Sequence, residues 1–355
     1  MKAMLDKPDA AKTAAREAFY AEIGGLSLAP LWERLRGLVP KEPQPRARPH
    51  GWRYAEARAL LLKSGALLTT EEAERRVLII ENPGLAGQSR ITNSLFAGLQ
   101  LLMPGERASA HRHVASALRF IIEGSCAYTA VDGERTLMRP GDFVLTPSWT
   151  WHDHGNDGAE PVIWLDGLDM HMVNLFDASF FENYPEREFP LARPAGDSEL
   201  RYPGTLLPEG DMPAGPNSPL INYRYTRARA ALADLAAATG PDPVHGYCLR
   251  YAHPQTGASP MPTISAAIRL LPKGFTTEDY RATDGTIFVC VEGEGETKIG
   301  DFTFNWTPRD IFVAPSWHNV VHKAAKESVL FSYSDRAAQE RLNLWRESAN
   351  RRNFT

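Results

Sequence analysis

The sequence contains few cysteines, and no two of them have the spacing of a metal-binding or redox motif. Cys126, Cys248 and Cys290 are odd in number and far apart in a chain of 355 residues. Neither a disulfide framework nor a zinc ribbon is therefore indicated. Cys126 and Cys290 lie in apolar segments, where a small buried side chain is the simpler interpretation. The chemistry of this protein must be sought in other residues.

The sequence also lacks a long apolar run, a secretory leader and a strong charge bias. No segment reaches the length of a membrane span, and the first residues, MKAMLDKPDAAK, have no apolar centre. The formal net charge is only −4, which gives no electrostatic reason to expect nucleic acid or an anionic membrane as a partner. We therefore expect a soluble cytoplasmic protein that binds neither nucleic acid nor membrane, long enough for two domains.

The N-terminal part has helical patterning. Apolar residues recur at spacings of three to four between about Ala10 and Leu38, which predicts two helices with Pro30 in the first turn of the second. A proline-rich stretch, KEPQPRARPH, then separates them from a further helical segment, Tyr54 to Lys63. We interpret residues 1–70 as an N-terminal helical arm.

From Arg75 onward the pattern changes to short β segments separated by turns. The segment Phe96 to Met103, for example, is apolar and ends at Pro104-Gly105. This density of strands and turns predicts an all-β barrel or sandwich, and only Thr226 to Thr239 has a clear helical pattern there. The expected parts after the arm are a barrel at 71–190, a linker with a helix at 191–255, a second barrel at 256–335 and a C-terminal helix at 336–355.

An internal repeat supports two copies of one barrel. Turn residues of the first half recur in the second with the same order and nearly the same separation. The matched sets are Gly105 with Gly274, Glu123-Gly124 with Glu292-Gly293, Pro140-Gly141-Asp142 with Pro308-Arg309-Asp310, and Pro147-Ser148-Trp149 with Pro315-Ser316-Trp317. The predicted fold is thus two related β-barrels, preceded by the helical arm.

Three histidines in the first copy form a candidate metal site. His111 and His113 alternate along a predicted strand, so their imidazoles point to the same face, and His152 follows a later turn. An HxH pair alone could also be two polar residues on a solvated strand face. The repeat argues against that interpretation, because the three positions are occupied in the second copy by Tyr280, Ala282 and Val320. A structural requirement shared by both copies would have kept the histidines in both.

The residues alone leave the identity of the metal open. Three neutral imidazoles suit zinc, copper, iron or nickel, and three histidines plus water also describe a hydrolytic zinc site. No Glu follows His113 within the next residues, Val114 to Leu118. A divalent ion with three neutral ligands keeps its full charge, so it could accept a dianionic chelating substrate and still leave a position for dioxygen.

Other residues are candidates for contacts around the metal. Arg119 lies on the metal-facing side of its predicted strand, either in a salt bridge or held for an anionic ligand, and its counterpart in the second copy is Phe288. His154 shares its strand face with His152 and could act as an acid, a base or a hydrogen-bond donor. However, His322 matches it in the second copy, which makes a structural role nearly as plausible. Aromatic residues could line a pocket or simply fill the core, namely Phe96, Trp149, Trp151 and Trp164.

The span Gly105 to Asp169 resembles the bicupin ring-cleaving dioxygenases, the family of gentisate 1,2-dioxygenase, whose relatives cleave salicylate or 1-hydroxy-2-naphthoate. The resemblance extends from about Arg75 to Ser334. It is most specific in AHRHVASALRFIIEG, DFVLTPSWTWHDHGN and VIWLDGLD. It implies two jelly-roll cupin barrels, one Fe(II) in the N-terminal barrel and often a homotetramer.

The resemblance also implies roles for individual residues. The iron ligands would be His111, His113 and His152. Gln100, His154 and Asp166 would be catalytic, and Arg119, Arg75 and Phe96 would contact the substrate. Trp149, one of the candidate pocket aromatics above, is a further expected substrate contact. Phe96 departs from the Tyr or Trp that relatives often carry there.

The implied reaction is cleavage of gentisate by O2 to maleylpyruvate, between the carboxyl-bearing carbon and the adjacent hydroxyl-bearing carbon. Salicylate or 1-hydroxy-2-naphthoate cleavage is the alternative within the family. Outside it, a zinc-dependent cupin hydrolase or isomerase, or a binding cupin without catalysis, also fits the residues.

Overall fold

The structure, a computed structural model, describes residues 10–204, 206–210 and 215–348. The chain divides into an N-terminal unit, residues 1–44, and a larger unit, residues 45–355. The N-terminal unit contains the two predicted helices, α1 (Ala10–Gly25) and α2 (Leu31–Leu38), and neither has a buried residue. Pro30 directly precedes α2, where its fixed φ suits the helix start. The predicted helical arm is confirmed in this part of the chain.

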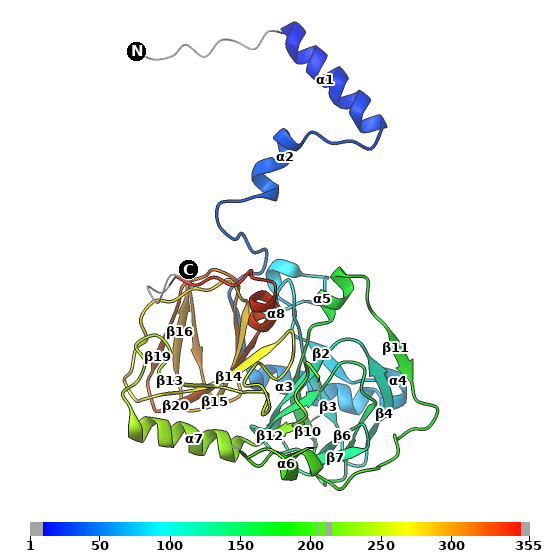
Figure 1. The fold of residues 1–355 in the computed structure, drawn as a ribbon, viewed down its shortest axis with the longest axis vertical. Coiled ribbons are helices and arrows are strands. Elements are labelled where there is room, and N and C mark those ends of the chain that lie inside the picture. Colours follow the sequence, from blue (N-terminus) through cyan, green and yellow to red (C-terminus); the bar gives the residue numbers. More distant parts are fainter. Residues whose placement is uncertain (1–9, 205, 211–214, 349–355) are drawn as a thin grey trace. The chain divides into compact units, whose positions relative to one another are not determined.

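The larger unit contains two pairs of β-sheets (Figure 1). The first barrel consists of a six-stranded sheet, in the order β12-β8-β5-β10-β3-β2, and a five-stranded sheet, β11-β4-β9-β6-β7. Its strands are β2 (Val77–Ile79), β3 (Phe96–Leu102), β4 (Arg107–His113), β5 (Ala117–Glu123), β6 (Ala127–Val131), β7 (Glu134–Leu137), β8 (Phe143–Thr146), β9 (His152–Asn156), β10 (Val162–Leu168), β11 (Phe181–Asn183) and β12 (Asn222–Tyr223).

The second barrel repeats this plan with a six-stranded sheet, β1-β18-β15-β20-β14-β13, and a three-stranded sheet, β17-β16-β19. Its strands are β1 (His50–Trp52), β13 (Tyr247–Arg250), β14 (Ser265–Leu271), β15 (Thr286–Glu292), β16 (Gly295–Ile299), β17 (Phe302–Trp306), β18 (Ile311–Ala314), β19 (Val320–Ala324) and β20 (Ser328–Ser334). One edge strand, β1, comes from a segment that the sequence analysis assigned to the arm. Its pairing with β18 joins that segment to the second barrel.

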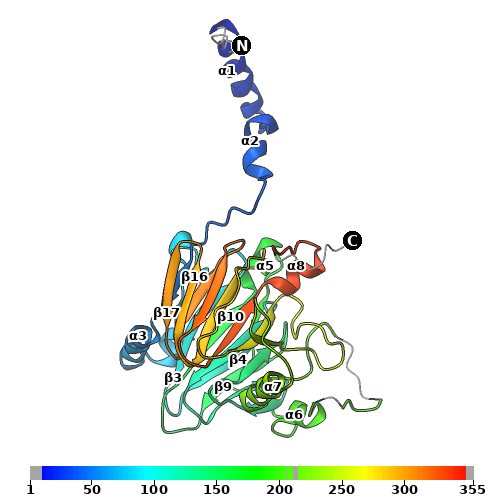
Figure 2. The same ribbon diagram turned by 90° about the vertical axis from the view of Figure 1, so that its left-hand side faces the viewer.

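The six-stranded sheets of the two barrels share one apolar core. Phe120 of β5 stacks on Phe331 of β20, with ring centroids 4.1 Å apart and planes 13° from parallel. One cluster of buried residues contains apolar side chains of β3, β5 and β10 together with those of β14, β15 and β20. Figure 2 shows the corresponding strands as adjacent layers. The second barrel therefore supports the sheet that carries one wall of the first.

Short helices cover the outside of the sheets. The helix α3 (Tyr54–Leu67) packs against β3, and α7 (Tyr225–Ala238) packs against β13 and β14. The remaining helical elements are α4 (Thr70–Ala73), the 3-10 turn η1 (Pro83–Leu85), α5 (Met170–Leu175), α6 (Asp197–Arg201) and α8 (Arg336–Arg341). The chain from 342 to 348 is not helical, and the last part of the helix predicted over 336–355 lies outside the described residues. None of the helices in the described ranges combines the length and apolar character that a membrane crossing requires.

The backbone confirms the internal repeat. Trp149 and Trp317 both have a positive φ, 61° and 62°, at the matched Pro-Ser-Trp turns. Gly141 and Arg309 are also matched, with φ of 84° and 78°. A non-glycine residue at such a φ is uncommon, since its Cβ is crowded there. The same turn geometry at equivalent positions therefore shows that the two barrels are copies of one fold.

Candidate metal centre

The three histidines predicted to bind a metal lie together in the first barrel. His111 and His113 are on β4, His152 begins β9, and the register of the two strands places His111 opposite His152. Their possible ligand atoms all lie within 4.8 Å of one another. The centroids of the His111 and His152 rings are 4.0 Å apart, and His113 lies 5.4 Å and 4.9 Å from them. The three side chains can therefore reach one ion.

Hydrogen bonds to the backbone fix the tautomer of each ring. The three Nδ1 atoms contact carbonyl oxygens, namely His111 with Ser109 at 3.0 Å, His113 with Ala115 at 2.7 Å and His152 with Thr150 at 2.9 Å. A carbonyl oxygen can only accept, so each Nδ1 carries the hydrogen and each Nε2 keeps a lone pair. The Nε2 atom of His152 is buried without a hydrogen-bond partner. A metal ion is the kind of partner that such an arrangement suits.

The electrostatics of the cluster keep the imidazoles neutral. Burial, with the nearby charge of Arg75, lowers the pKa of His111 to about 2, and burial lowers the pKa of His113 to about 4. Burial also holds the pKa of His152 well below its ordinary value. Within the described part of the chain, the cluster contains three histidines and no carboxylate. This donor set fits a transition-metal ion and not calcium or magnesium, which prefer oxygen ligands.

Arg75 lies directly against the ring of His111. Its guanidinium contacts both ring nitrogens, and Nη2 is 2.6 Å from Nε2. A metal ion would need the same Nε2 lone pair, so Arg75 must turn away from it when an ion binds. Arg75 and Phe181 also line a cavity of about 540 Å³, and the Phe181 ring centroid is 5.6 Å from that of His111. The cavity thus borders Arg75 and Phe181, and none of the three histidines is among its lining residues.

Arg119 and Asp166 form a loose, buried ion pair on neighbouring strands. They are opposite each other in the β5–β10 register, and the Nε–Oδ1 distance is 3.4 Å. Arg119 also donates to the hydroxyl of Thr146, while its Nε has no hydrogen-bond partner. Burial lowers the pKa of Arg119 to about 10 and raises that of Asp166 to about 6, although the charge of each residue stabilises the charged form of the other. The guanidinium therefore keeps capacity to bind a second anion.

Two further polar residues near the centre have buried atoms without a partner. His154 contacts the Thr129 hydroxyl through Nδ1 at 3.0 Å, but its Nε2 is unpaired. The Nε2 amide nitrogen of Gln100 on β3 is also buried and unpaired. Buried polar atoms are nearly always satisfied, so unpaired ones here are available for a ligand. Trp164 instead donates to Asp166 Oδ1 at 2.9 Å and is structural in this arrangement.

Phe96 and Trp149, the two aromatic residues predicted to contact the substrate, have different surroundings. Phe96 begins β3 and is half-buried, and its carbonyl accepts a hydrogen bond from Tyr333 of the second barrel at 3.3 Å. The ring of Trp149 has the guanidinium of Arg112 4.4 Å above it. Its backbone N–H donates to the carbonyl of His113 at 2.8 Å. Trp149 thus holds the end of β4 in place, and substrate contact by either ring stays a prediction.

The sequence analysis did not single out three residues that touch the centre. Phe181 approaches His111 from β11, a short exposed strand that pairs with β4. Thr129 and Thr146 hold His154 and Arg119 through their hydroxyls. Alternation along the apolar strands could have placed the two threonines on the inner face. By contrast, β11 has no apolar alternation that would have identified it.

Known proteins share this geometry and sequence. The family of the Cupin domain matches residues 98–168. Gentisate 1,2 dioxygenase 1 of Aquipseudomonas alcaligenes is 52% identical over 97% of this chain and 99% of its own length, and 5-aminosalicylate 1,2-dioxygenase of Comamonas sp is 34% identical over 97% and 93%. The solved structure of salicylate 1,2-dioxygenase from Pseudoaminobacter salicylatoxidans with gentisate has a TM-score of 0.91 and 32% identity, and covers 99% of this chain and 97% of its own. The chain therefore belongs to the gentisate 1,2-dioxygenase family of cupin ring-cleaving dioxygenases.

Proposed function

We propose that this protein is an Fe(II)-dependent dioxygenase that cleaves gentisate to maleylpyruvate. The bond broken lies between the carboxyl-bearing carbon and the neighbouring hydroxyl-bearing carbon, and both oxygen atoms of O2 enter the product, so no external reductant is consumed. The observation that carries the proposal is the cluster of three neutral histidines, each with a lone pair on Nε2, and no carboxylate. The relative that is 52% identical supports the choice of gentisate.

The charge of the centre matches that substrate. Iron held by the Nε2 atoms of His111, His113 and His152 would supply adjacent positions at which the substrate and dioxygen bind together. Because the three ligands are neutral, a divalent ion keeps its full charge for a chelating acid. A carboxylate and an adjacent phenolate oxygen provide the complementary negative charge and the chelating geometry.

The residues around the histidines would hold the substrate in place. Arg119 would pair with the substrate carboxylate, since its Nε makes no hydrogen bond and its ion pair with Asp166 is loose, at 3.4 Å. His154 Nε2 and the Gln100 amide would contact ring hydroxyls or dioxygen, because both atoms are buried without a partner. Asp166 would tune the charge of Arg119, and Arg75 would assist with the carboxylate after it leaves His111.

The second ring hydroxyl of gentisate makes it the preferred substrate. This group is para to the hydroxyl beside the carboxylate, and it supplies electron density to the ring carbons that react with oxygen. Salicylate lacks that group, so it should react more slowly. 5-Aminosalicylate and 1-hydroxy-2-naphthoate are the alternative substrates to compare, since dioxygenases named for these acids are similar to this chain. Phe96, on β3, is where we expect selectivity among them to be decided.

The test is anaerobic loading with ferrous salt, addition of gentisate and then admission of air. Oxygen consumption in equal amount to gentisate, together with a ring-fission chromophore, is the expected result. Parallel runs with salicylate, 5-aminosalicylate and 1-hydroxy-2-naphthoate rank the substrates. Faster turnover of one of those acids would make that acid, and not gentisate, the assigned substrate. Zinc in the purified protein with no oxygen uptake after ferrous loading would contradict the proposal altogether.

We also propose a homotetramer in the cytoplasm, as the resemblance implied. Exposed apolar side chains on the two N-terminal helices support an association between chains, among them Phe19, Leu31, Trp32 and Leu35. Light scattering of the full chain would measure the assembly. If those helices make the contact, a variant with Trp32 and Leu35 changed to serine should form an assembly of lower mass.

A further inference from the structure

The second barrel contains a cavity at the place where the first barrel has its metal centre. Tyr280 and Val320, which match two of the histidines, form a β-bridge equivalent to the pairing of His111 and His152. The cavity has a volume of about 300 Å³, and Tyr280 and Val320 are among its lining residues. The second copy has therefore lost the metal ligands but has kept an internal space.

An arginine without a counter-charge points into this cavity. Arg269 lies on β14 at the position that Gln100 occupies on β3. Its Nε is buried without a hydrogen-bond partner, and no described carboxylate forms an ion pair with it. The guanidinium lies 5.2 Å from the centroid of the Phe288 ring. Among the described residues, its polar side-chain contact is between Nη1 and His322 Nε2, at 3.4 Å. A cation whose Nε is buried without a partner is costly.

The neighbouring histidine accepts a hydrogen from this arginine. Trp306 Nε1 donates to the hydroxyl of Thr297 at 2.9 Å, and that hydroxyl contacts His322 Nδ1 at 2.8 Å. A guanidinium N–H can only donate, so the His322 Nε2 that faces Arg269 Nη1 is the acceptor. Burial and the charge of Arg269 hold the pKa of His322 well below its ordinary value, so the ring is neutral. His322 therefore orients Arg269 without neutralising its charge.

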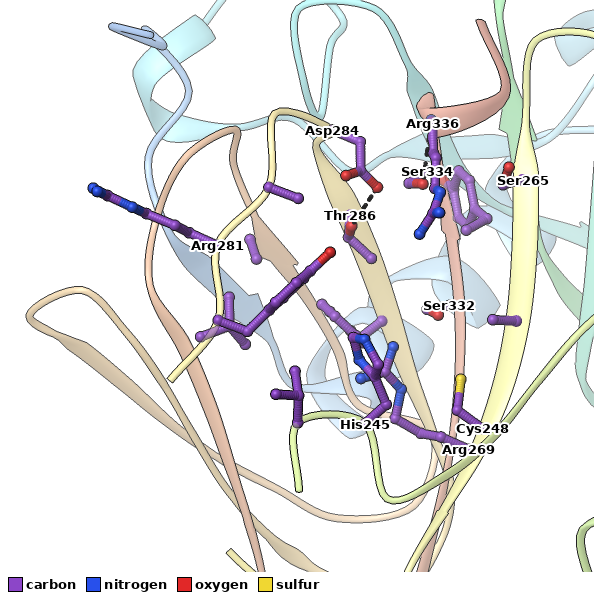
Figure 3. A pocket seen from close by; sticks show the side chains of 18 of the residues that line it. His245, Cys248, Ser265, Arg269, Arg281, Asp284, Thr286, Ser332, Ser334 and Arg336 are labelled. Carbon is purple, nitrogen blue, oxygen red and sulfur yellow. Dashed lines mark hydrogen bonds between the residues drawn. The ribbon is translucent and has the colours of Figure 1, made fainter. Parts of the chain in front are cut away.

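Two other charged residues of the lining, Arg336 and Asp284, have partners of their own. Arg336 pairs with Glu340 at 2.7 Å, and the charge of Asp284 also stabilises it. Asp284 accepts from Trp345 Nε1 at 2.9 Å. Figure 3 shows Arg336 and Asp284 at one end of the cavity, Arg269 at the other, and Arg281 directed away from it. The end near Arg269 is therefore positive.

We propose that the second barrel binds a small organic carboxylate, about the size of one aromatic ring, whose carboxylate contacts Arg269. The unpaired Nε of Arg269 requires an acceptor, and a guanidinium matches a carboxylate in geometry. An inorganic anion would fill only part of the space, whereas Phe288 and Tyr333 provide aromatic walls for an organic body. The site is separate from the proposed iron centre, and its occupation does not depend on the reaction assigned to the first barrel.

The test uses 4-bromobenzoate, whose bromine can be located by its anomalous scattering in crystals of the metal-loaded enzyme. The expected result is bromine density in the second-barrel cavity, with saturable binding in solution. Arg269→Gln should weaken this binding at least tenfold, the loss expected for a charge-assisted hydrogen bond. Lys323→Gln is the matched control, since it removes one charge from an exposed side chain next to His322. It should leave the affinity unchanged.

Two further ligands keep the proposal testable if Arg269→Gln does not fold. The neutral 4-bromobenzamide has the same shape and should not occupy the cavity of the unmodified enzyme. Inorganic phosphate should not displace 4-bromobenzoate at equal concentration. The proposal is overturned by bromine only in the first barrel or nowhere, by equal occupancy of the amide, by displacement with phosphate, or by unchanged affinity in a folded Arg269→Gln variant.

Discussion

Replacing Arg119 by glutamine should selectively weaken the capture of the substrate. Glutamine keeps a polar head near Thr146 but removes the buried positive charge, which Asp166 compensates only loosely at 3.4 Å from Nε. A hydrogen bond to a charged group contributes roughly 1.5–3 kcal/mol. At about 1.4 kcal/mol for each factor of ten, this predicts a KM for gentisate that is roughly 10- to 150-fold higher. The change in kcat should be smaller, because the charge binds the carboxylate in both the ground and transition states.

Arg112→Gln provides the matched control for this substitution. Arg112 lies between His111 and His113 on β4, but its guanidinium pairs with Glu182 and stacks on Trp149. Arg112→Gln therefore removes one positive charge close to the three histidines, while the buried charge of Arg119 stays in place. We expect its KM to equal that of the unmodified enzyme.

The assay is steady-state oxygen uptake over a range of gentisate concentrations, with the iron content measured for each variant. A second comparison, Arg119→Gln combined with Asp166→Asn, removes both members of the buried pair. It should fold better than Arg119→Gln alone if an uncompensated Asp166 is the source of any instability. An unchanged KM in Arg119→Gln, or an equal rise in Arg112→Gln, would refute the role given to Arg119.

Three other predictions concern the metal, pH and the contact between barrels. His111→Ala should lose bound iron and oxygen uptake while its circular dichroism stays that of the parent, and retained turnover would remove the site assignment. Burial raises the pKa of Asp335 to about 6, against about 3.9 unfolded. Its protonated form therefore adds up to roughly 3 kcal/mol of stability below about pH 4, lost as the pH rises to about 6. Asp335→Asn should flatten the pH dependence of the urea midpoint over that window, and parallel curves would contradict the shift. Phe331→Ala should lower the free energy of unfolding by about 3–5 kcal/mol, because it removes a buried ring stacked on Phe120; a loss below 1 kcal/mol in urea unfolding would show that this stack is unimportant.

Local patterns were sufficient to predict the two barrels and the three histidines. Turn chemistry is determined by a few consecutive residues, so the matched Pro-Ser-Trp turns at Trp149 and Trp317 could be paired before their φ values were known. Strand alternation likewise placed His111 and His113 on one face. The contrast with the second copy then separated the histidines from residues that the fold itself requires.

Features that depend on distant pairing could not be predicted in this way. The strand β1 joins the second barrel because it pairs with β18, far away in the sequence. Phe181 reaches His111 through β11, whose three residues are all exposed and carry no alternation. Arg75 could be assigned to the substrate, but its position against the His111 ring follows from the packing of several elements. Such contacts are set by tertiary structure, which short sequence windows do not encode.

The stack of Phe120 on Phe331 has a consequence for how this gene can change. A chain truncated before the second barrel would expose an apolar sheet face to water. Phe120 and its neighbours would then lose the side chains that bury them. The second barrel, which carries no counterparts of His111, His113 and His152, is thus still required for the first barrel to stay soluble.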